Sequence, residues 1–206
     1  EIAFKDYPSR VRKLVVPKTK QVYTKPSKKK DSANQKTFHS RQTTSPDFFA
    51  QGKFILPVKD YDMTSLFFGD KREMHSGKQV IHYYHKGVDL AVPVNTKILA
   101  SNHGQVVFAG DLFHRGVVVT LHHGNGIFSE YLHLTKPLVK QGEWVKKGQV
   151  IALSGNSGVS TGPHLHWHIT HQNRVVNPLF WLFFNLSGIL ENPALFSKAH
   201  WNEKGL

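Results

Sequence analysis

Two short segments of the sequence hold residue types that bind divalent metal ions. They are His85-Lys86-Gly87-Val88-Asp89 and His164-Leu165-His166. Zinc takes imidazole and carboxylate ligands when no thiolate is available, and the chain contains no cysteine. Three of the four groups on His85, Asp89, His164 and His166 can hold one zinc and leave a corner of the tetrahedron open for water. An open corner is typical of a catalytic zinc site rather than a structural one.

The spacing of these groups suits extended chain, in which side chains two positions apart lie on the same face. His85 and Asp89 are an even number of positions apart and can point the same way. In a strand over residues 164–170, three imidazoles share one face and three large apolar side chains share the other, namely Leu165, Trp167 and Ile169. We predict that the apolar face packs into the core and that the imidazole face is exposed. Histidines outside this pattern are interpreted as solvent-exposed or hydrogen-bonded side chains: His39, His75, His103, His114 and His200.

The elements that must position these groups are predicted to be short β-strands. Apolar and β-branched runs occupy residues 88–92, 97–100, 105–109, 116–122, 126–132, 149–154 and 164–170. Because no convincing helix of ten or more residues lies between them, the pattern predicts a mainly β fold: a small antiparallel β-sheet domain with few short helices. Residues 179–186 are predicted to form a short helix that packs on the sheet. Three glycines are expected to permit positive-φ turns that bring a loop over the site, namely Gly155, Gly158 and Gly162.

Positive charge is concentrated near the beginning of the chain. The 206 residues carry a formal net charge of +13, and residues 1–41 hold 12 of the 27 Lys and Arg but only 3 of the 14 Asp and Glu. We predict a basic, weakly structured segment at 1–48 (a linker or regulatory segment, with one strand at 12–16), a folded β domain at 49–180 and an aromatic extension at 181–206. The basic segment is expected either to be a solvated linker or to bind polyanions such as a membrane surface, an anionic cell-wall polymer or nucleic acid. The modest charge of the remainder argues against a specific nucleic-acid protein.

Composition excludes several other classes. Without cysteine, the chain has no thiolate metal site, cysteine nucleophile or disulfide. The longest apolar stretch, at 175–190, is interrupted by Asn and Pro residues and by Gly188, so we expect no membrane-spanning helix. No Gly-Lys-Ser/Thr phosphate loop and no His-Glu-x-x-His zinc-protease helix is present. The sequence starts at Glu1 without a charged-then-apolar leader, so we expect any export signal to lie outside it.

Further motifs accompany the two histidine segments in a fixed order from about Phe54 to Pro178. They include Phe68-Gly69-Asp70-Lys71-Arg72, Gly104-Gln105-Val106-Val107, His123-Gly124-Asn125-Gly126, Tyr131-Leu132-His133-Leu134, Val145-Lys146-Lys147-Gly148-Gln149, Ser157-Gly158-Val159-Ser160-Thr161-Gly162-Pro163 and Asn177-Pro178. Each motif alone is weak, whereas all of them in this order are highly specific. Together they resemble the M23 (lysostaphin-type, or LytM-domain) family of zinc peptidases, which cleave peptidoglycan peptides.

This resemblance implies a role for each matched residue. His85, Asp89 and His166 would be the three Zn²⁺ ligands, and His133 and His164 would be two catalytic imidazoles that do not bind the metal. One of these imidazoles would take the proton of the attacking water, and the other would steady the oxyanion or donate to the leaving amine. The sequence leaves open which histidine does which. The implied fold is a small antiparallel β-sheet structure, lysostaphin-type or duplicated-hybrid-motif-like, with an open groove whose floor carries the zinc.

The function that the resemblance predicts is zinc-dependent hydrolysis of peptide bonds in peptidoglycan stem peptides or cross-links. The enzyme would act in the bacterial cell envelope (periplasm) or after secretion, on a bond between D-amino acids or within a glycine-rich bridge. The alternative is a catalytically inactive LytM-type module that binds cell wall and activates another hydrolase. Inactive relatives usually lose a ligand, whereas here all five metal and catalytic positions hold the residues that the chemistry needs.

One position departs from the family pattern. His168 stands where many members carry Glu, two residues after the second histidine of the His-x-His pair. We predict that His168 contacts substrate rather than lying beside the metal, because the three-ligand set is already complete. Tyr83, Tyr84 or Tyr131 could add a hydroxyl donor to the site, and Tyr131 could instead be a groove-wall or core residue.

Overall fold

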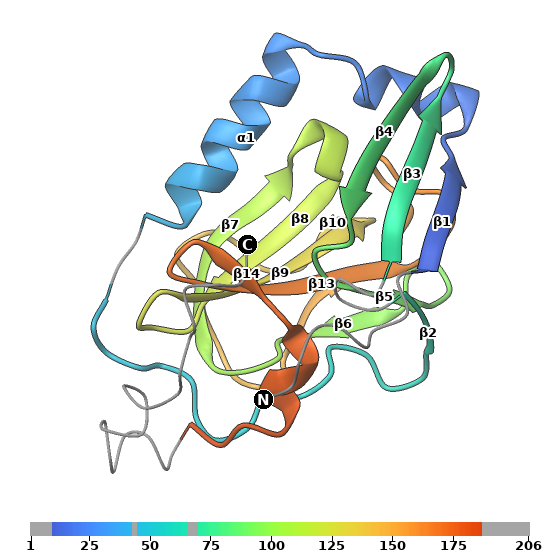
Figure 1. The fold of residues 1–206 in the computed structure, drawn as a ribbon. Helices are drawn as coiled ribbons and strands as arrows, with labels where there is room; N and C mark the ends of the chain where they lie inside the picture. Colours follow the sequence, from blue (N-terminus) through green and yellow to red (C-terminus); the bar gives the residue numbers. More distant parts are fainter. Residues whose placement is uncertain (1–9, 43–44, 66–69, 187–206) are drawn as a thin grey trace, which may run out of the picture.

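The largest sheet of the structure carries two of the three predicted metal ligands. The computed structural model describes residues 10–42, 45–65 and 70–186. Within these ranges the sheet runs in the order β11 (Trp144–Val145), β7 (Gly104–Asp111), β8 (Val117–His122), β9 (Ile127–Leu134), β13 (Leu165–His171), β5 (Val88–Ala91) and β2 (Asp62–Ser65), and β14 (Arg174–Val176) pairs with β13. All of these pairings are antiparallel (Figure 1). The predicted fold class, mainly β with antiparallel sheets and few helices, is confirmed.

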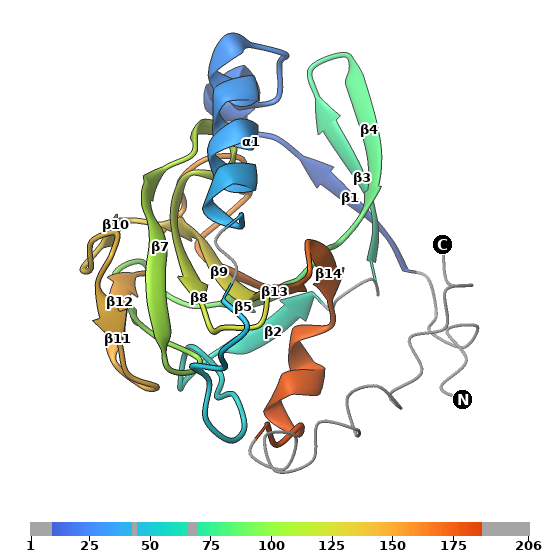
Figure 2. The same ribbon diagram turned by 90° about the vertical axis from the view of Figure 1, so that its left-hand side faces the viewer.

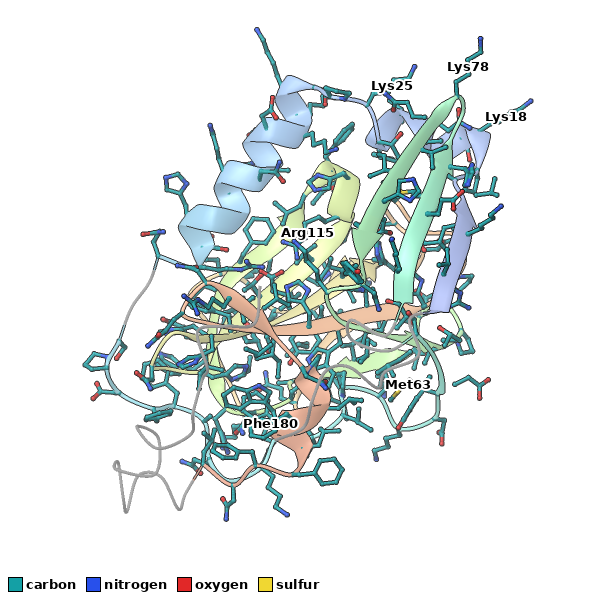
Figure 3. All side chains as sticks on the ribbon, viewed as in Figure 1. Lys18, Lys25, Met63, Lys78, Arg115 and Phe180 are labelled. Carbon is teal, nitrogen blue, oxygen red and sulfur yellow. The ribbon has the colours of Figure 1, made fainter. Side chains whose placement is uncertain are left out.

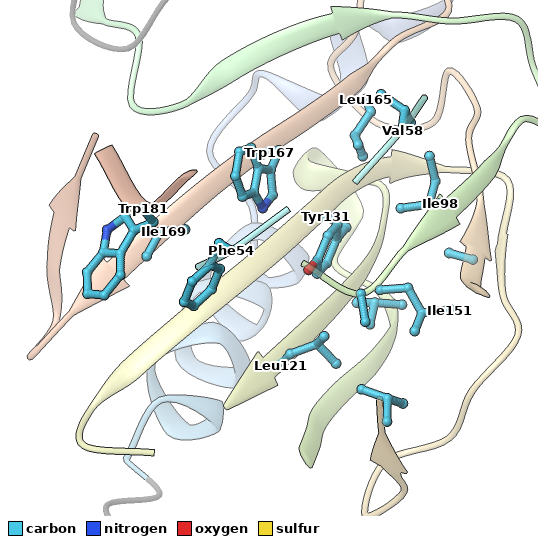
Figure 4. Packing of buried hydrophobic residues seen from close by; sticks show 14 of the residues in the cluster. Phe54, Val58, Ile98, Leu121, Tyr131, Ile151, Leu165, Trp167, Ile169 and Trp181 are labelled. Carbon is cyan, nitrogen blue, oxygen red and sulfur yellow. The ribbon is translucent and has the colours of Figure 1, made fainter. Parts of the chain in front are cut away.

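A smaller antiparallel sheet shares its core with the large one. Its order is β10 (Lys136–Pro137), β12 (Val150–Leu153) and β6 (Lys97–Leu99). Ile98 and Ile151 from this sheet belong to the same buried cluster as Tyr131 and Trp167 of the large sheet (Figure 4). The predicted apolar face of β13 is confirmed, because its three large apolar side chains are all fully buried in this cluster: Leu165, Trp167 and Ile169.

The opposite face of the central strands is also covered, which corrects the prediction of an exposed imidazole face. His168 and Thr170 on that face of β13 are buried, and every residue of β9 is buried. A second apolar cluster explains part of this cover, because it joins Val118 and Leu132 of the sheet to Ala33 of a helix. Alternation along a strand predicts which side chains share a face. It does not predict what packs against that face.

The N-terminal segment contains more regular structure than its composition predicted. β1 (Arg10–Val15) agrees with the strand predicted at 12–16, but the 3₁₀ helix η2 (Lys18–Tyr23) and the helix α1 (Lys28–Ser40) follow it. The hydroxyl of Ser27 accepts a hydrogen bond from the backbone N–H of Lys30 (3.2 Å) and so caps α1. The described part of α1 buries only Ala33, so the helix has little of the hydrophobic periodicity by which helices are recognised. The division of the chain at 48 and 180 stays a prediction.

β1 joins a third sheet that leads into the site. It pairs in parallel with β3 (Asp70–Ser76), which pairs antiparallel with β4 (Gln79–Tyr84). This sheet and α1 stand on the same side of the large sheet (Figure 2). At its outer end, Lys18, Lys25 and Lys78 extend away from the ribbon (Figure 3). The third sheet matters for function because β4 ends directly before His85.

The described C-terminal part ends in a short helix. η4 (Pro178–Leu182) is a 3₁₀ helix whose first turn is capped by Asn177, which accepts a hydrogen bond from the backbone N–H of Leu179 (3.0 Å). Its Trp181 is buried in the main core, in agreement with the short packed helix predicted within 179–186. No helix in the described ranges has both the length and the apolar character to cross a membrane.

A chain of hydrogen bonds crosses the core beside Trp167. His123 donates through Nδ1 to the carbonyl oxygen of His103 (2.8 Å), and its Nε2 lies 2.7 Å from the hydroxyl of Ser129. The Ser129 hydroxyl bonds in turn to the hydroxyl of Tyr131, which also bonds to Ser101. Tyr131 is fully buried in this network, so of the alternatives left open by the sequence the structure favours a core residue.

This buried histidine predicts a pH dependence of stability. Burial lowers the pKa of His123 from 6.5 to about 4. A depressed native pKa gives stability that is present above pH 6.5 and is lost as the pH falls toward 4, a loss of about 2 kcal/mol between pH 7 and pH 5. We expect His123→Gln to show a smaller fall in the free energy of unfolding over this interval than the wild type, measured by urea unfolding in the presence of a chelator. His82→Gln, at an exposed position, is the control; equal falls in His123→Gln and wild type would contradict the prediction.

Candidate metal centre

Three of the predicted site residues meet where β5 and β13 pair. Asp89 lies directly opposite His166 in the register of these strands, and His85 directly follows β4. Nε2 of His85 lies 3.1 Å from Oδ1 of Asp89 and 3.0 Å from Nδ1 of His166, which lies 2.8 Å from the same oxygen. Gly87 permits this close approach, since a Cβ there would lie 2.6 Å from the carbonyl oxygen of Trp167 and 2.8 Å from Nε2 of His166.

The spacing of these three atoms fits a zinc ion. Tetrahedral zinc ligands at about 2.0–2.1 Å from the metal lie about 3.4 Å from one another, so outward movements of a few tenths of an ångström would admit the ion. Within the described residues, this is the group of histidines and acidic residues whose ligand atoms converge closely enough to hold a metal. Two imidazoles and one carboxylate are also a donor set that catalytic zinc sites use.

The outward-facing atoms of the three residues are held by further partners. Nδ1 of His85 lies 3.0 Å from the hydroxyl of Ser65, which accepts a hydrogen bond from Arg72 (2.7 Å). Arg72 also forms an ion pair with Oδ2 of Asp89, and both side chains are buried. Although burial raises the pKa of the Asp89 carboxyl, hydrogen bonds with His166 and His85 hold it well below its usual value, so Asp89 is ionised. Such outer partners fix the orientation of metal ligands.

The two predicted catalytic imidazoles lie beside this group without joining it. Nδ1 of His133 donates to the carbonyl oxygen of Ser157 (2.8 Å), and Nδ1 of His164 donates to the carbonyl oxygen of Gly162 (2.8 Å). The two ring centroids are 4.8 Å apart, and Nε2 of His164 lies 3.7 Å from Oδ1 of Asp89. Because Nδ1 is used in each ring, Nε2 is the nitrogen left for proton transfer.

His133 has two properties of a functional residue. Its φ of 62° lies in the left-handed region, which costs a non-glycine residue of order 1–3 kcal/mol and is often found at active sites. Burial, and then the neighbouring His164, lowers its pKa from 6.5 to about 3. The imidazole is therefore neutral near pH 7 and can accept a proton at Nε2.

The loop that holds these histidines is itself tied to the N-terminal segment. Gly158 has a φ of 64°, as predicted, whereas Gly155 and Gly162 have no positive φ. Lys20 of η2 donates to the carbonyl oxygens of Asn156 (2.5 Å) and Ser160 (3.0 Å) on either side of Gly158. Nothing in the sequence singled out Lys20, because the contact spans 136 residues.

This geometry agrees with the comparison of the sequence with protein families, in which the profile of peptidase family M23 matches residues 83–178. Residues 83–178 are a peptidase family M23 domain. The matched stretch includes all five predicted site residues, and it ends at the start of η4.

Relatives of this M23 chain include enzymes and solved structures. It is 44% identical over 95 residues to the peptidoglycan DD-endopeptidase ShyA of Vibrio cholerae (46% of this chain and 22% of that protein). It is 49% identical over 96 residues to an uncharacterized metalloprotease of Haemophilus influenzae (46% and 20%). The chain thus spans about a fifth of the length of these curated relatives.

Two solved structures resemble the M23 chain over a larger share of its length. A peptidase M23 from Pseudomonas aeruginosa has a TM-score of 0.62 and 31% identity, covering 77% of this chain and 63% of that one. A zinc containing peptidase from Vibrio cholerae has a TM-score of 0.56 and 34% identity, covering 63% and 40%.

Several side chains of the M23 chain differ from their predicted roles. His168 is buried, and its Nδ1 lies 3.3 Å from Nε2 of His166, so its position favours the metal-proximal alternative over the predicted contact with substrate. Tyr83 lies beside Arg72 and Tyr84 is exposed, and a hydroxyl donor from either of them stays a prediction.

Some histidines predicted to lie outside the site, and part of one motif, can also be placed. His39 and His75 are hydrogen-bonded, to Gln35 and Glu73 respectively, as predicted for histidines outside the site. Phe68, Gly69 and His200 lie outside the described residues. Arg72, which closes the first of the quoted motifs, reaches the metal centre through its ion pair with Asp89.

Proposed function

We propose that this chain is a zinc-dependent endopeptidase that cleaves peptide bonds in peptidoglycan, with Zn²⁺ held by His85, Asp89 and His166. The observation that carries the proposal is the convergence of three ligand atoms within about 3 Å of one another, beside two imidazoles that the ligand set does not use. Zinc bound there would polarise the substrate carbonyl and make water a stronger acid.

The two imidazoles divide the proton transfers between them. Neutral His133 accepts the proton of the attacking water at Nε2, and the carbonyl oxygen of Ser157 stabilises the positive charge that forms on the ring. His164, when protonated, donates from Nε2 to the developing oxyanion or to the leaving amine. The fixed Nδ1 hydrogen bonds orient both rings before substrate arrives.

The names of the relatives favour one class of bond. ShyA and two further relatives from Vibrio cholerae are peptidoglycan DD-endopeptidases. Their names support a cleaved bond between D-amino acids rather than one within a glycine-rich bridge. Such a substrate places the enzyme in the bacterial cell envelope, in the periplasm, or outside the cell. The basic N-terminal segment would add affinity for an anionic cell-wall polymer or a membrane surface.

The proposal is tested with defined muropeptide dimers and zinc-loaded protein, with the products read by mass spectrometry. We expect dimers joined through D-amino acids to be cut, glycine-bridged dimers to survive, and a chelator to stop the reaction. Cleavage of glycine-bridged dimers alone would overturn the choice of bond. Intact dimers of both kinds, together with a faster reaction of a separate cell-wall hydrolase, would favour the inactive activating module instead.

A further inference from the structure

A fully buried carboxylate lies one side chain away from the metal centre. Glu130 on β9 is directly opposite His168 on β13 in the strand register, and none of Glu130 is exposed. Oε1 accepts from Nε of Arg41 (2.8 Å), and Oε2 pairs with Arg115 and with Nε2 of His168 (2.9 Å). An ionised carboxylate is stable in the interior only when it is paired in this way.

The charges of this cluster are set by its two arginines. Burial alone would raise the pKa of Glu130, but Arg115 and Arg41 hold it well below its usual value. Arg115 lies in η3 (Phe113–Arg115) and is labelled in Figure 3, and Arg41 directly follows α1. Two cations from separate parts of the chain therefore keep one anion beneath His168.

The hydrogen bonds from this anion to the ligand group have one consistent direction. Nδ1 of His166 faces Asp89 and His85, so it must carry a lone pair in order to bind a metal. Nε2 of His166 then carries the hydrogen and donates to Nδ1 of His168 (3.3 Å). His168 in turn carries its hydrogen on Nε2 and donates to Oε2 of Glu130 (2.9 Å), which is nearer to this nitrogen than Nη2 of Arg41 (3.2 Å).

We infer that His168 is a positioning residue, which transmits the negative charge of Glu130 to His166 and fixes the ring and tautomer of that ligand. The inference rests on the proposed zinc site. Metal-binding histidines usually donate directly to a carboxylate or carbonyl group, and loss of that partner costs 10–100-fold in metal affinity or activity. Here an imidazole stands between the ligand and its carboxylate.

The series of hydrogen bonds from His166 through His168 and Glu130 to Arg41 also connects the N-terminal segment to the metal centre. Arg41 lies beyond α1, and α1 is held to the large sheet by the cluster around Ala33. Arg41 lies outside the matched M23 region and bonds to Glu130, Glu130 bonds to His168, and His168 bonds to the ligand His166. The segment is therefore linked to the ligand indirectly. This segment therefore acts as part of the support of the metal site rather than as a separable linker.

The test measures zinc affinity of the full chain by competition with a chromophoric chelator, which does not depend on activity. We expect His168→Ala to bind zinc roughly 10–100-fold more weakly than wild type. His168→Gln, which keeps one acceptor and one donor, should recover most of the affinity. His171→Ala, which removes another buried histidine of β13, is the control and should leave affinity unchanged.

Arg41→Ala should weaken zinc binding in the same direction by a smaller factor, whereas Lys36→Ala on the exposed side of α1 should not. Zinc affinity equal to wild type in folded His168→Ala would overturn the inference and leave the cluster a structural ion-pair network. Should the alanine variant not fold, zinc affinity equal to wild type in Arg41→Ala would do the same. Failure of the proposed function has a different signature, because the wild type itself would then bind no zinc at this site or cut no dimer.

Discussion

Asp89→Asn is expected to lose zinc and to fall in turnover of muropeptide dimers by about 1000-fold or more. Oδ1 of Asp89 is the atom on which His85 and His166 converge, and its charge is the only negative charge among the three proposed ligands. Zinc supplies several kcal/mol of transition-state stabilisation, and each 1.36 kcal/mol is a factor of about ten in rate. Metal content measured by atomic absorption and dimer cleavage should therefore fall together.

The choice of asparagine protects this test from an unfolded variant. Both Asp89→Ala and Asp89→Asn remove the charge that pairs with the buried Arg72, but alanine also removes the acceptor oxygen and leaves a space in the interior. Asparagine keeps the shape and one acceptor. Asp60→Asn, at an exposed position, controls for loss of a carboxylate. One zinc per chain and normal turnover in Asp89→Asn would refute the ligand assignment.

The sequence was informative where strand spacing decides the outcome. Even spacing grouped His85, Asp89, His164 and His166 as candidate ligands, and the resemblance to the M23 family selected three of them: His85, Asp89 and His166. In the structure, the pairing of β5 with β13 sets Asp89 opposite His166. The resemblance also implied catalytic roles for His133 and His164, whose Nδ1 partners are the backbone carbonyls of Ser157 and Gly162. Backbone partners leave no signal in residue types, so the ring orientations could not be predicted.

The support of the site could not be predicted, because it depends on what covers each face. Arg72 and Glu130 read as ordinary polar positions in strands, and their burial follows from packing by elements far along the chain. α1 was missed because it is stabilised by a cap at Ser27 and by contact of Ala33 rather than by an apolar stripe. His168 was assigned to substrate because the three-ligand set was already complete, and without α1 and Arg41 nothing in the sequence indicated that its face would be closed.

His133→Ala is expected to keep its zinc and to lose turnover by roughly 100-fold or more. The His133 ring is not among the atoms that converge on the metal position, and its centroid lies 6.1 Å from that of His166. Its removal therefore takes away the proton acceptor and leaves the ligands in place. Zinc content and single-turnover cleavage of a muropeptide dimer measure the two effects separately. Loss of zinc together with turnover would show that His133 holds the metal or the fold instead.

A second variant separates chemistry from packing in this prediction. His133 and His164 are neighbours that serve one reaction, and residues that act as a unit are strongly non-additive. The double variant His133→Ala/His164→Ala should therefore be little slower than the slower of the two single variants. If the two losses multiply instead, each imidazole contributes independently, and the division into a proton acceptor at His133 and a donor at His164 within one proton-transfer sequence is wrong.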